Sequence, residues 1–260
     1  MSCIDCADAA WLGRLAQVLA TPDATCAPRG MPIYETFHAT TVVDMTRSLV
    51  RVPSRGLNPR FAAAEALWIL RGSDRLDELT PYNKRMAEFS DDGATLRGAY
   101  GPRLARQLHY IVNALRRDRD TRQAVASIWT PEPAPSRDVP CTIALTFMIR
   151  GDHLHAHAFM RSSDVWLGLP YDLFSFSAYA ATVVALYNAL AEGSAVSLGT
   201  LFLTAASSHL YETHREAAER VLAAAEPADD RRALPAHATL DELADYLIDI
   251  REGGYDAAVA

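Results

Sequence analysis

The chain has 260 residues, of which 50% are hydrophobic and 22% charged. This composition is typical of a soluble globular protein with one large core or two small ones. The formal net charge of -7 excludes a broad positive field, so we expect no nucleic acid as a partner.

The four cysteines are Cys3, Cys6, Cys26 and Cys141. We find no secretory-type apolar segment at the start, and no apolar run of the ~18 residues that span a bilayer. We therefore expect a cytoplasmic protein with reduced thiols and no membrane contact. Cys3 and Cys6 form a single C-x-x-C pair, which by itself is a weak indication of a metal or redox site.

Apolar periodicity predicts the elements in chain order. Helices are expected over residues 8–20, 59–71, 101–117, 172–191, 209–225 and 239–250. Strands are expected over residues 36–52, 124–129, 142–149, 153–160 and 198–204, with a hairpin turn at 150–152. Because no linker or repeat divides the chain, we expect one α/β (α+β) domain over residues 1–260, with the N-terminal helix and loop (1–35) at its periphery.

Cys141 is a candidate nucleophile, because it follows Pro140 at the start of a predicted strand. An internal cysteine is more often a small buried hydrophobe. However, Arg161 on the adjoining strand could lower the pKa of the thiol and favour the thiolate. Both interpretations of Cys141 remain open at this level.

Glu65 is the single acid on an otherwise apolar predicted helix, so it must be paired, hydrated or functional. His153, His155 and His157 alternate and would share one strand face. Three imidazoles could bind zinc, but no neighbouring Cys, Asp or Glu completes a recognised spacing. A solvated or interface face is favoured, and we expect no metal.

The most specific motif lies at residues 161–172, which read Arg-Ser-Ser-Asp-Val-Trp-Leu-Gly-Leu-Pro-Tyr-Asp. It resembles the R-S-x-D-V/I-x-L-G-L/V-P-F/Y-N motif of the thymidylate synthase family. Other segments in matching order resemble that family too: Glu65-Ala66-Leu67-Trp68, Tyr100-Gly101, Arg122-Gln123, Pro140-Cys141 and His209-Leu210-Tyr211 with His214. The resemblance covers residues from about 29 to 214. It implies a thymidylate-synthase-like fold, a mixed β-sheet covered by helices, with one sheet face forming a dimer interface.

The resemblance also implies a chemistry. The Cys141 thiolate would add to C6 of a pyrimidine nucleotide, with Glu65 organising water and moving protons and Tyr100 assisting near C5. The co-substrate would be 5,10-methylenetetrahydrofolate, with Asp164 at the pterin ring and Gly168 and Glu65 in the same site.

The nucleotide monophosphate would be held by residues of two subunits. Arg29, Arg161 and Ser162 would bind its phosphate, together with the partner subunit's Arg122. His209 and Tyr211 would reach the sugar 3'-hydroxyl. The resemblance therefore implies a homodimer with shared active sites.

Position 172 departs from the family pattern, because Asp172 stands where the motif ends in asparagine. A carboxyl group accepts from cytosine N4–H and, when protonated, donates to N3, whereas a carboxamide suits uracil. A mismatch between the hydrogen-bonding groups of the base and of the side chain in a desolvated pocket costs ~1–3 kcal/mol of binding free energy. Asp172 therefore favours cytosine, a change that marks the deoxycytidylate hydroxymethylase branch, in which water completes the reaction.

Further departures indicate that this is no ordinary thymidylate synthase. Thr142 replaces the histidine after the nucleophile, Gln123 the second arginine, and Met160 the glutamine before Arg161. Residues 82–89 replace a tryptophan-rich segment, and residues 255–260 only weakly resemble the family's tail. We expect a folate-dependent hydroxymethyltransferase acting on dCMP, with CMP open. The alternatives are dUMP methylation to dTMP and a catalytically idle relative that binds nucleotide or RNA.

Overall fold

A six-stranded mixed sheet lies at the centre of the computed structural model, which describes residues 5–191, 193–229, 231 and 233–254. Cys3 and residues 255–260 lie outside these ranges. The strands are β1 (Ala24–Cys26), β2 (Ile33–Asp44), β3 (Val125–Ser127), β4 (Thr142–Arg150), β5 (His153–Asp164) and β6 (Ser197–Tyr211), in the order β1-β2-β6-β5-β4-β3. β5 and β6 pair in parallel and the other neighbours pair antiparallel. The predicted mixed sheet and α/β class are confirmed.

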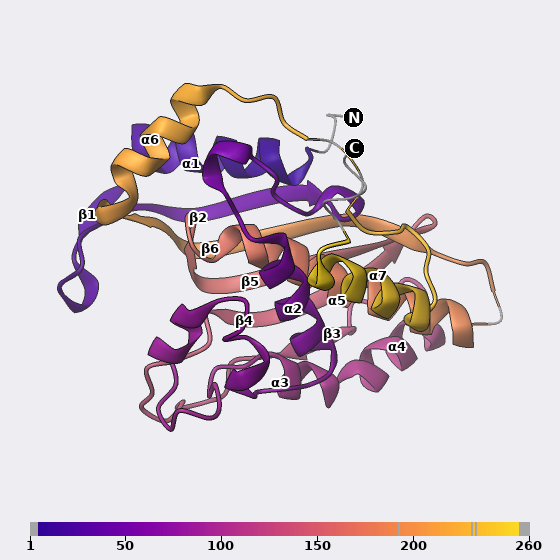
Figure 1. Cartoon of the computed structure of the whole chain (residues 1–260). Coiled ribbons are helices and arrows are strands. Elements are labelled where there is room, and N and C mark those ends of the chain that lie inside the picture. The colour runs from indigo at the N-terminus through magenta and orange to yellow at the C-terminus, as the bar shows by residue number, and fades with distance from the viewer. Residues whose placement is uncertain (1–4, 192, 230, 232, 255–260) are drawn as a thin grey trace.

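Seven α-helices of the described chain pack with this sheet. They are α1 (Ala7–Ala20), α2 (Pro59–Leu70), α3 (Gly101–Ala105), α4 (Leu108–Arg117), α5 (Leu169–Leu190), α6 (Arg215–Ala224) and α7 (Leu240–Glu252). α2 and α7 lie side by side, while α1 and α6 lie together near strands β1 and β2 (Figure 1).

α5 is the central helix of the core. It has 22 residues and, by length and composition alone, is apolar enough to cross a membrane, but 78% of its apolar stretch is buried inside the protein. Phe174 and Phe176 are fully buried on it. Burial of this kind is expected for a core helix that packs on every side.

The N-terminal helix α1 contributes to the same core, although residues 1–35 were expected at the periphery. Trp11 and Leu15 have no exposed surface. The Trp11 indole Nε1 donates a hydrogen bond to the Val165 carbonyl at 2.7 Å, which ties α1 to the turn after β5.

Three element predictions were wrong in part. The predicted strand 36–52 ends at Asp44, where the Asp44 side chain accepts from the Thr46 N–H and a 3-10 turn, Met45–Arg47, follows. The predicted helix 101–117 is broken between α3 and α4, where the Gln107 side chain bonds both the N–H and the C=O of Ser127 on β3. The predicted helix 209–225 begins only at Arg215, because residues 209–211 extend β6. His209 pairs with Glu35 on one side and Asp164 on the other. Strand pairing on both sides of residues 209–211 overrides the helical preference that the local sequence indicates.

An irregularity interrupts β4 directly after Cys141. Thr142 pairs with Met160 and Ala144 with Phe159, so Ile143 is an extra residue in β4. Such β-bulges re-aim neighbouring side chains. Here Thr142 is fully buried and Ile143 is 41% exposed.

Candidate active site

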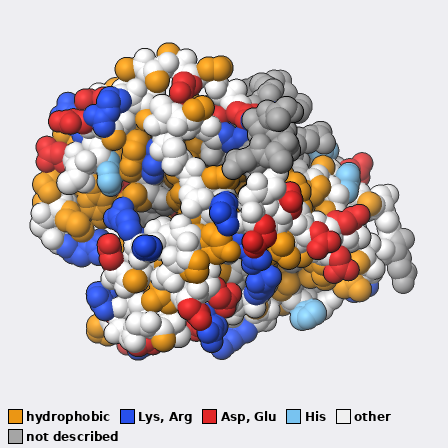
Figure 2. Space-filling view, viewed as in Figure 1, with side chains coloured by type: hydrophobic (Ala, Val, Ile, Leu, Met, Phe, Trp, Pro, Cys, Tyr) orange, Lys and Arg blue, Asp and Glu red, His pale blue; other side chains and the backbone are white. Residues whose placement is uncertain are grey.

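A cavity of about 810 Å³ opens where β5 and β6 end. Parallel strands bring their carboxyl ends to one edge of the sheet, so the polar ends of β5 and β6 meet there. The predicted site residues that line the cavity are Arg29, Glu65, Cys141, Arg161, Ser162, Asp164, Gly168, Asp172, His209 and Tyr211. Lys and Arg side chains gather beside the hollow on this face (Figure 2).

Two predicted residues do not line the cavity. Tyr100 stacks on Phe176 with ring centroids 5.9 Å apart and interacts with Asp172, Cys141 and Glu65, although it is not a lining residue. Burial, followed by the charges of Asp172 and Cys141, raises the pKa of Tyr100 well above its usual value, so the phenol stays protonated. Arg122 is exposed on the surface. Its predicted contact with substrate requires a second subunit and stays a prediction.

Cys141 is held at the start of β4 by Arg161 on β5. The Arg161 Nε donates to the Pro140 carbonyl at 2.9 Å, and its Nη2 lies 3.8 Å from Cys141 Sγ. Burial raises the pKa of the Cys141 thiol, and Arg161 opposes this shift without overcoming it. Arg161 therefore acts in the predicted direction, but the net shift is the reverse of the prediction.

Glu65 projects from the middle of α2, whose start is fixed by Asn58. The Asn58 side chain accepts hydrogen bonds from the N–H groups of Arg60 and Phe61, and Pro59 occupies the first turn. Burial raises the pKa of Glu65 to about 7, although a 3.1 Å hydrogen bond from Ser175 Oγ to Oε2 opposes the shift. Glu65 can therefore accept or donate a proton near neutral pH.

Asp172 lies in the first turn of α5, facing the same cavity. Burial, with the negative charges of Glu65 and Asp164, raises the pKa of Asp172 well above its usual value. This shift favours the protonated carboxyl, which offers one donor and one acceptor. In one orientation this pair matches cytosine, and in the reversed orientation it also matches the N3–H and O4 of uracil.

The predicted sugar and phosphate residues are brought together from three elements. Arg29 has a left-handed backbone (φ 55°), a costly conformation for a residue other than glycine, and its Nη2 lies 3.4 Å from the Tyr211 hydroxyl. His209 Nδ1 lies 3.4 Å from Ser162 Oγ. Burial lowers the pKa of His209, which favours the neutral imidazole.

Asp164 and Gly168 form the turn between β5 and α5. Asp164 Oδ1 accepts from the N–H groups of Trp166 and Leu167 at 2.8 and 2.9 Å. Within the part of the chain that the structure describes, we find no hydrogen bond to its other oxygen. A Cβ added at Gly168 would lie 3.5 Å from Asp172 Oδ2, so glycine keeps the space beside that carboxyl open.

Sequence reasoning missed a cationic rim at the cavity mouth. The Arg55 guanidinium lies 4.1 Å from the centroid of the Trp166 ring and donates to the Trp166 carbonyl at 2.8 Å. His214 stacks on the same indole, and Arg85 also lines the mouth. Arg55 lies between the predicted strand 36–52 and the predicted helix 59–71, and only the tertiary fold brings it to the cavity.

The three alternating histidines do not form a metal site. His155 Nδ1 accepts from the Thr200 N–H at 3.2 Å, and His157 Nε2 lies 2.8 Å from Thr204 Oγ1. Within residues 5–191, 193–229, 231 and 233–254, we find no group of three His, Cys, Asp or Glu side chains arranged to hold a metal ion.

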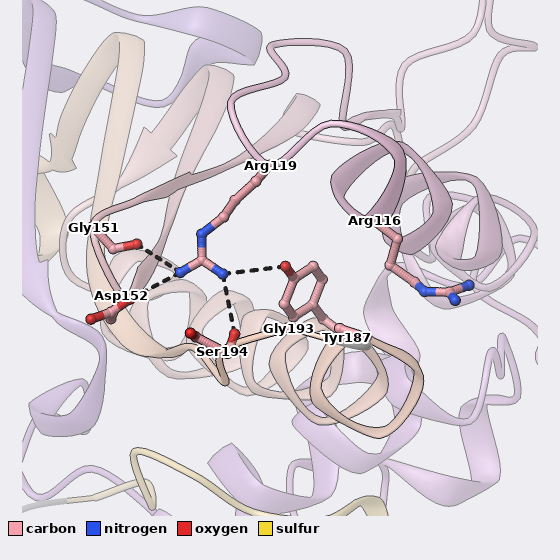
Figure 3. Close-up of a pocket in the computed structure, with 8 residues that line it drawn as sticks. Arg116, Arg119, Gly151, Asp152, Tyr187, Gly193 and Ser194 are labelled. Carbon is pink, nitrogen blue, oxygen red and sulfur yellow. Dashed lines mark hydrogen bonds and ion pairs between the residues drawn. The ribbon is translucent and has the colours of Figure 1, made fainter.

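A second hollow, of about 660 Å³, lies between the C-terminal ends of α4 and α5 and the β4–β5 turn (Figure 3). Arg119 donates there to the carbonyls of Gly151 and Ser194, to Asp152 Oδ1 and to the Tyr187 hydroxyl, at 2.9 to 3.4 Å. Arg116 stands apart from this network. The Arg119 guanidinium makes its hydrogen bonds inside the protein and so joins three segments of the fold. Few of its N–H donors remain for a ligand.

Comparison with known proteins identifies the class of this chain. A family model described as thymidylate synthase matches residues 10–256, so the chain belongs to the thymidylate synthase family.

Two relatives are named deoxyuridylate hydroxymethyltransferase. The one from Bacillus phage SP01 is 31% identical over 207 residues, covering 71% of this chain and 52% of that protein. The one from Pseudomonas phage M6 is 32% identical over 167 residues, covering 61% of this chain and 46% of that protein. The chain therefore spans about half the length of these relatives.

Proposed function

We propose that this protein is a folate-dependent hydroxymethyltransferase that converts a cytidylate, dCMP or CMP, to its 5-hydroxymethyl derivative. The proposal includes a cytoplasmic homodimer of single-domain subunits. The membership of the thymidylate synthase family supports one-carbon transfer to a pyrimidine monophosphate. The names of both relatives support hydroxymethylation.

The buried carboxyl of Asp172, which stands where the family motif has asparagine, is the observation that carries the choice of cytosine. Addition of a thiolate to C6 places negative charge on the ring, and a proton delivered to N3 of cytosine neutralises it. If Asp172 then ionises, its oxygens still accept from N4–H. Uracil already carries a proton on N3, and an ionised Asp172 would repel its O4 oxygen.

The other side chains take roles that their places in the cavity support. Cys141 forms the bond to C6, and Arg161 beside it attracts both the thiolate and the substrate phosphate. Glu65 moves protons near neutral pH, assisted by the Tyr100 phenol. Arg29, Ser162, His209 and Tyr211 hold the phosphate and sugar.

The cavity residues also fit the co-substrate. No hydrogen bond within the described chain reaches one carboxylate oxygen of Asp164, Gly168 leaves space beside Asp172, and the volume of about 810 Å³ can hold a nucleotide with a pterin. Methylenetetrahydrofolate would supply one carbon at the oxidation level of formaldehyde. Glu65 lies on the same wall and would serve both ligands.

The dimer is supported by the face of the sheet opposite α5. Phe159 is 37% exposed on this face, beside the half-buried Phe202 and His157. Apolar side chains in the middle of a sheet are usually covered. The predicted contact of the partner subunit's Arg122 with the phosphate also requires a second subunit.

A second candidate is hydroxymethylation of dUMP. Both relatives carry the deoxyuridylate name, and a protonated Asp172 can also satisfy uracil when its carboxyl is reversed. The two candidates share every step and differ only in which base, cytosine or uracil, the enzyme binds.

The test is tritium release from dCMP, CMP and dUMP labelled at C5, with methylenetetrahydrofolate, product mass and absorbance at 340 nm. Release from a cytidylate with a gain of CH2O and no rise in absorbance supports the first proposal. The same gain from dUMP alone supports the second candidate. Release from dUMP with rising absorbance indicates methylation to dTMP. Binding without release indicates an idle relative and overturns both.

A further inference from the structure

The hydroxyl of Thr142 is buried without a satisfactory hydrogen-bond partner. Thr142 has no exposed surface, and its Oγ1 is among the buried polar atoms of the described chain that lack a partner. A buried hydroxyl in this state costs about 1–3 kcal/mol. Such a group needs an explanation, and a bound water or ligand is the simplest one.

The bulge in β4 turns this hydroxyl to the side of the sheet that the helices cover and on which Ser162 and Asp164 face the cavity. Thr142 pairs with the buried Met160, and Leu145 pairs with the buried Ala158, so these side chains share the helix-facing side of the sheet. Without the extra Ile143, strict alternation from Leu145 would turn Thr142 to the opposite face.

The neighbours of Thr142 are polar groups of the proposed site. The Tyr100 phenol is the polar neighbour of the Thr142 hydroxyl, and this contact opposes the rise in the pKa of Tyr100. The two oxygens do not meet in normal hydrogen-bond geometry, so Thr142 Oγ1 remains without a partner in the described chain. Thr142 follows the nucleophile Cys141 directly in β4. Glu65, which also acts on Tyr100, uses Oε2 to accept from Ser175 and keeps its other oxygen available. A buried water typically needs two to four such partners.

We propose that Thr142 is a positioning residue that holds the water for hydroxymethyl transfer, with Tyr100 and Glu65 as the other partners. This inference rests on the proposed function. The water oxygen bonds to the exocyclic methylene carbon on C5, and its proton passes to Glu65. The electron pair of the exocyclic double bond moves into the ring and then re-forms C5=C6, expelling the Cys141 thiolate from C6. No oxidant or reductant takes part, and tetrahydrofolate leaves unoxidised.

Other buried unpartnered hydroxyls do not share this environment. The hydroxyls of Thr36 on β2, Ser163 on β5 and Ser48 also lack partners in the described chain. Ser163 alternates with Ser162 and Asp164, which line the cavity, and Thr36 is aligned with Ser163 through Ser208, so both point to the opposite side of the sheet. Thr36 therefore provides a matched control for the same substitution.

The test compares Thr142→Val, Thr142→Ser and Thr36→Val with the unaltered enzyme. For each protein, tritium release from the C5-labelled nucleotide reports methylene formation, and mass reports the hydroxymethyl product. Added 2-mercaptoethanol intercepts any methylene that water does not reach. We expect Thr142→Val to release tritium but to give about tenfold less hydroxymethyl product per tritium, with a thiol adduct instead. Thr142→Ser and Thr36→Val should keep the original ratio.

An unchanged ratio in Thr142→Val overturns the role of Thr142 and leaves the proposed function intact. Absence of tritium release by the unaltered enzyme with every nucleotide overturns the proposed function itself. Because valine removes an unpartnered hydroxyl without changing the shape, the thermal midpoint should stay the same or rise. If Thr142→Val does not fold, Thr142→Ala gives the same ratio test, and a normal ratio in it equally refutes the inference.

Discussion

The two hollows of this molecule differ in how their buried polar groups are satisfied. Around Arg119, four acceptors of the protein surround one guanidinium. Around Cys141, the protein leaves an oxygen of Glu65 and the hydroxyl of Thr142 without such partners, and the Asp172 carboxyl is buried beside other carboxyls. The first arrangement stabilises the fold, whereas the second leaves polar groups that a bound ligand can satisfy.

The energetic consequence separates the two regions further. Satisfied buried groups contribute to stability, whereas buried acids with raised pKa values cost free energy that only binding or catalysis recovers. Removal of a group from the candidate active site should therefore cost activity and spare or improve stability. Removal of a group from the Arg119 hollow should instead lower stability and spare activity.

The largest expected effect is that of Cys141→Ala. Loss of the nucleophile removes the covalent step, so we expect at least ~10³-fold loss of kcat in the tritium-release assay. Nucleotide binding and the thermal midpoint should be retained. Cys26→Ala, at an exposed thiol, is the matched control and should be fully active. A loss of less than about tenfold in Cys141→Ala would contradict covalent catalysis.

The next effect concerns Glu65 and pH. Its pKa in the folded protein is about 7, above its ordinary value of 4.5, so unfolding releases a proton between these pH values. The free energy of unfolding therefore falls as pH rises through this range, by about 3 kcal/mol in all. Urea unfolding should show Glu65→Gln as more stable than the unaltered protein at pH 8 and similar to it near pH 4.5.

The pH dependence of activity should follow the ionisation of the Glu65 carboxyl. If ionised Glu65 is the base, kcat/KM rises as pH passes about 7 and Glu65→Gln loses this rise. Glu216→Gln, at an exposed position of α6, is the control. Equal pH dependence of unfolding in both variants would show that Glu65 does not titrate in this range.

Asp172→Asn should change which base is read. A carboxamide cannot protonate N3 of cytosine but suits uracil, so the ratio of kcat/KM for cytidylate over dUMP should fall by roughly ten- to a hundredfold. The measurement is parallel kinetics with dCMP, CMP and dUMP. An unaltered ratio would mean that other residues select the base.

The smallest expected effect lies in the second hollow. Arg119→Ala should lower the free energy of unfolding by about 1–3 kcal/mol through loss of its hydrogen bonds, with kcat/KM changed by less than about twofold. Arg116→Ala, which removes the neighbouring guanidinium, should leave both within about 0.5 kcal/mol. A selective loss of activity in Arg119→Ala would show that this hollow serves the reaction.

Local patterns sufficed for much of the fold. The helices over residues 8–20 and 59–71 and the β4–β5 hairpin were predicted and confirmed, because they depend on periodicity and capping within a few residues. The break of helix 101–117 and the strand at His209 were not predicted. Both are imposed by partners distant in sequence, Ser127 in the first case and β2 and β5 in the second.

The sequence by itself determined the family and most of the residues that meet in the cavity. Motifs and their order along the chain can be recognised without knowing any distance in the folded protein. Only the tertiary structure decided the raised pKa values of Glu65, Asp172 and Cys141, the place of Arg55 and the orientation of Thr142. The reason is physical: pKa values follow burial and neighbouring charge, and the direction of Thr142 follows one extra residue in a strand pairing. Neither quantity can be derived from residue order alone.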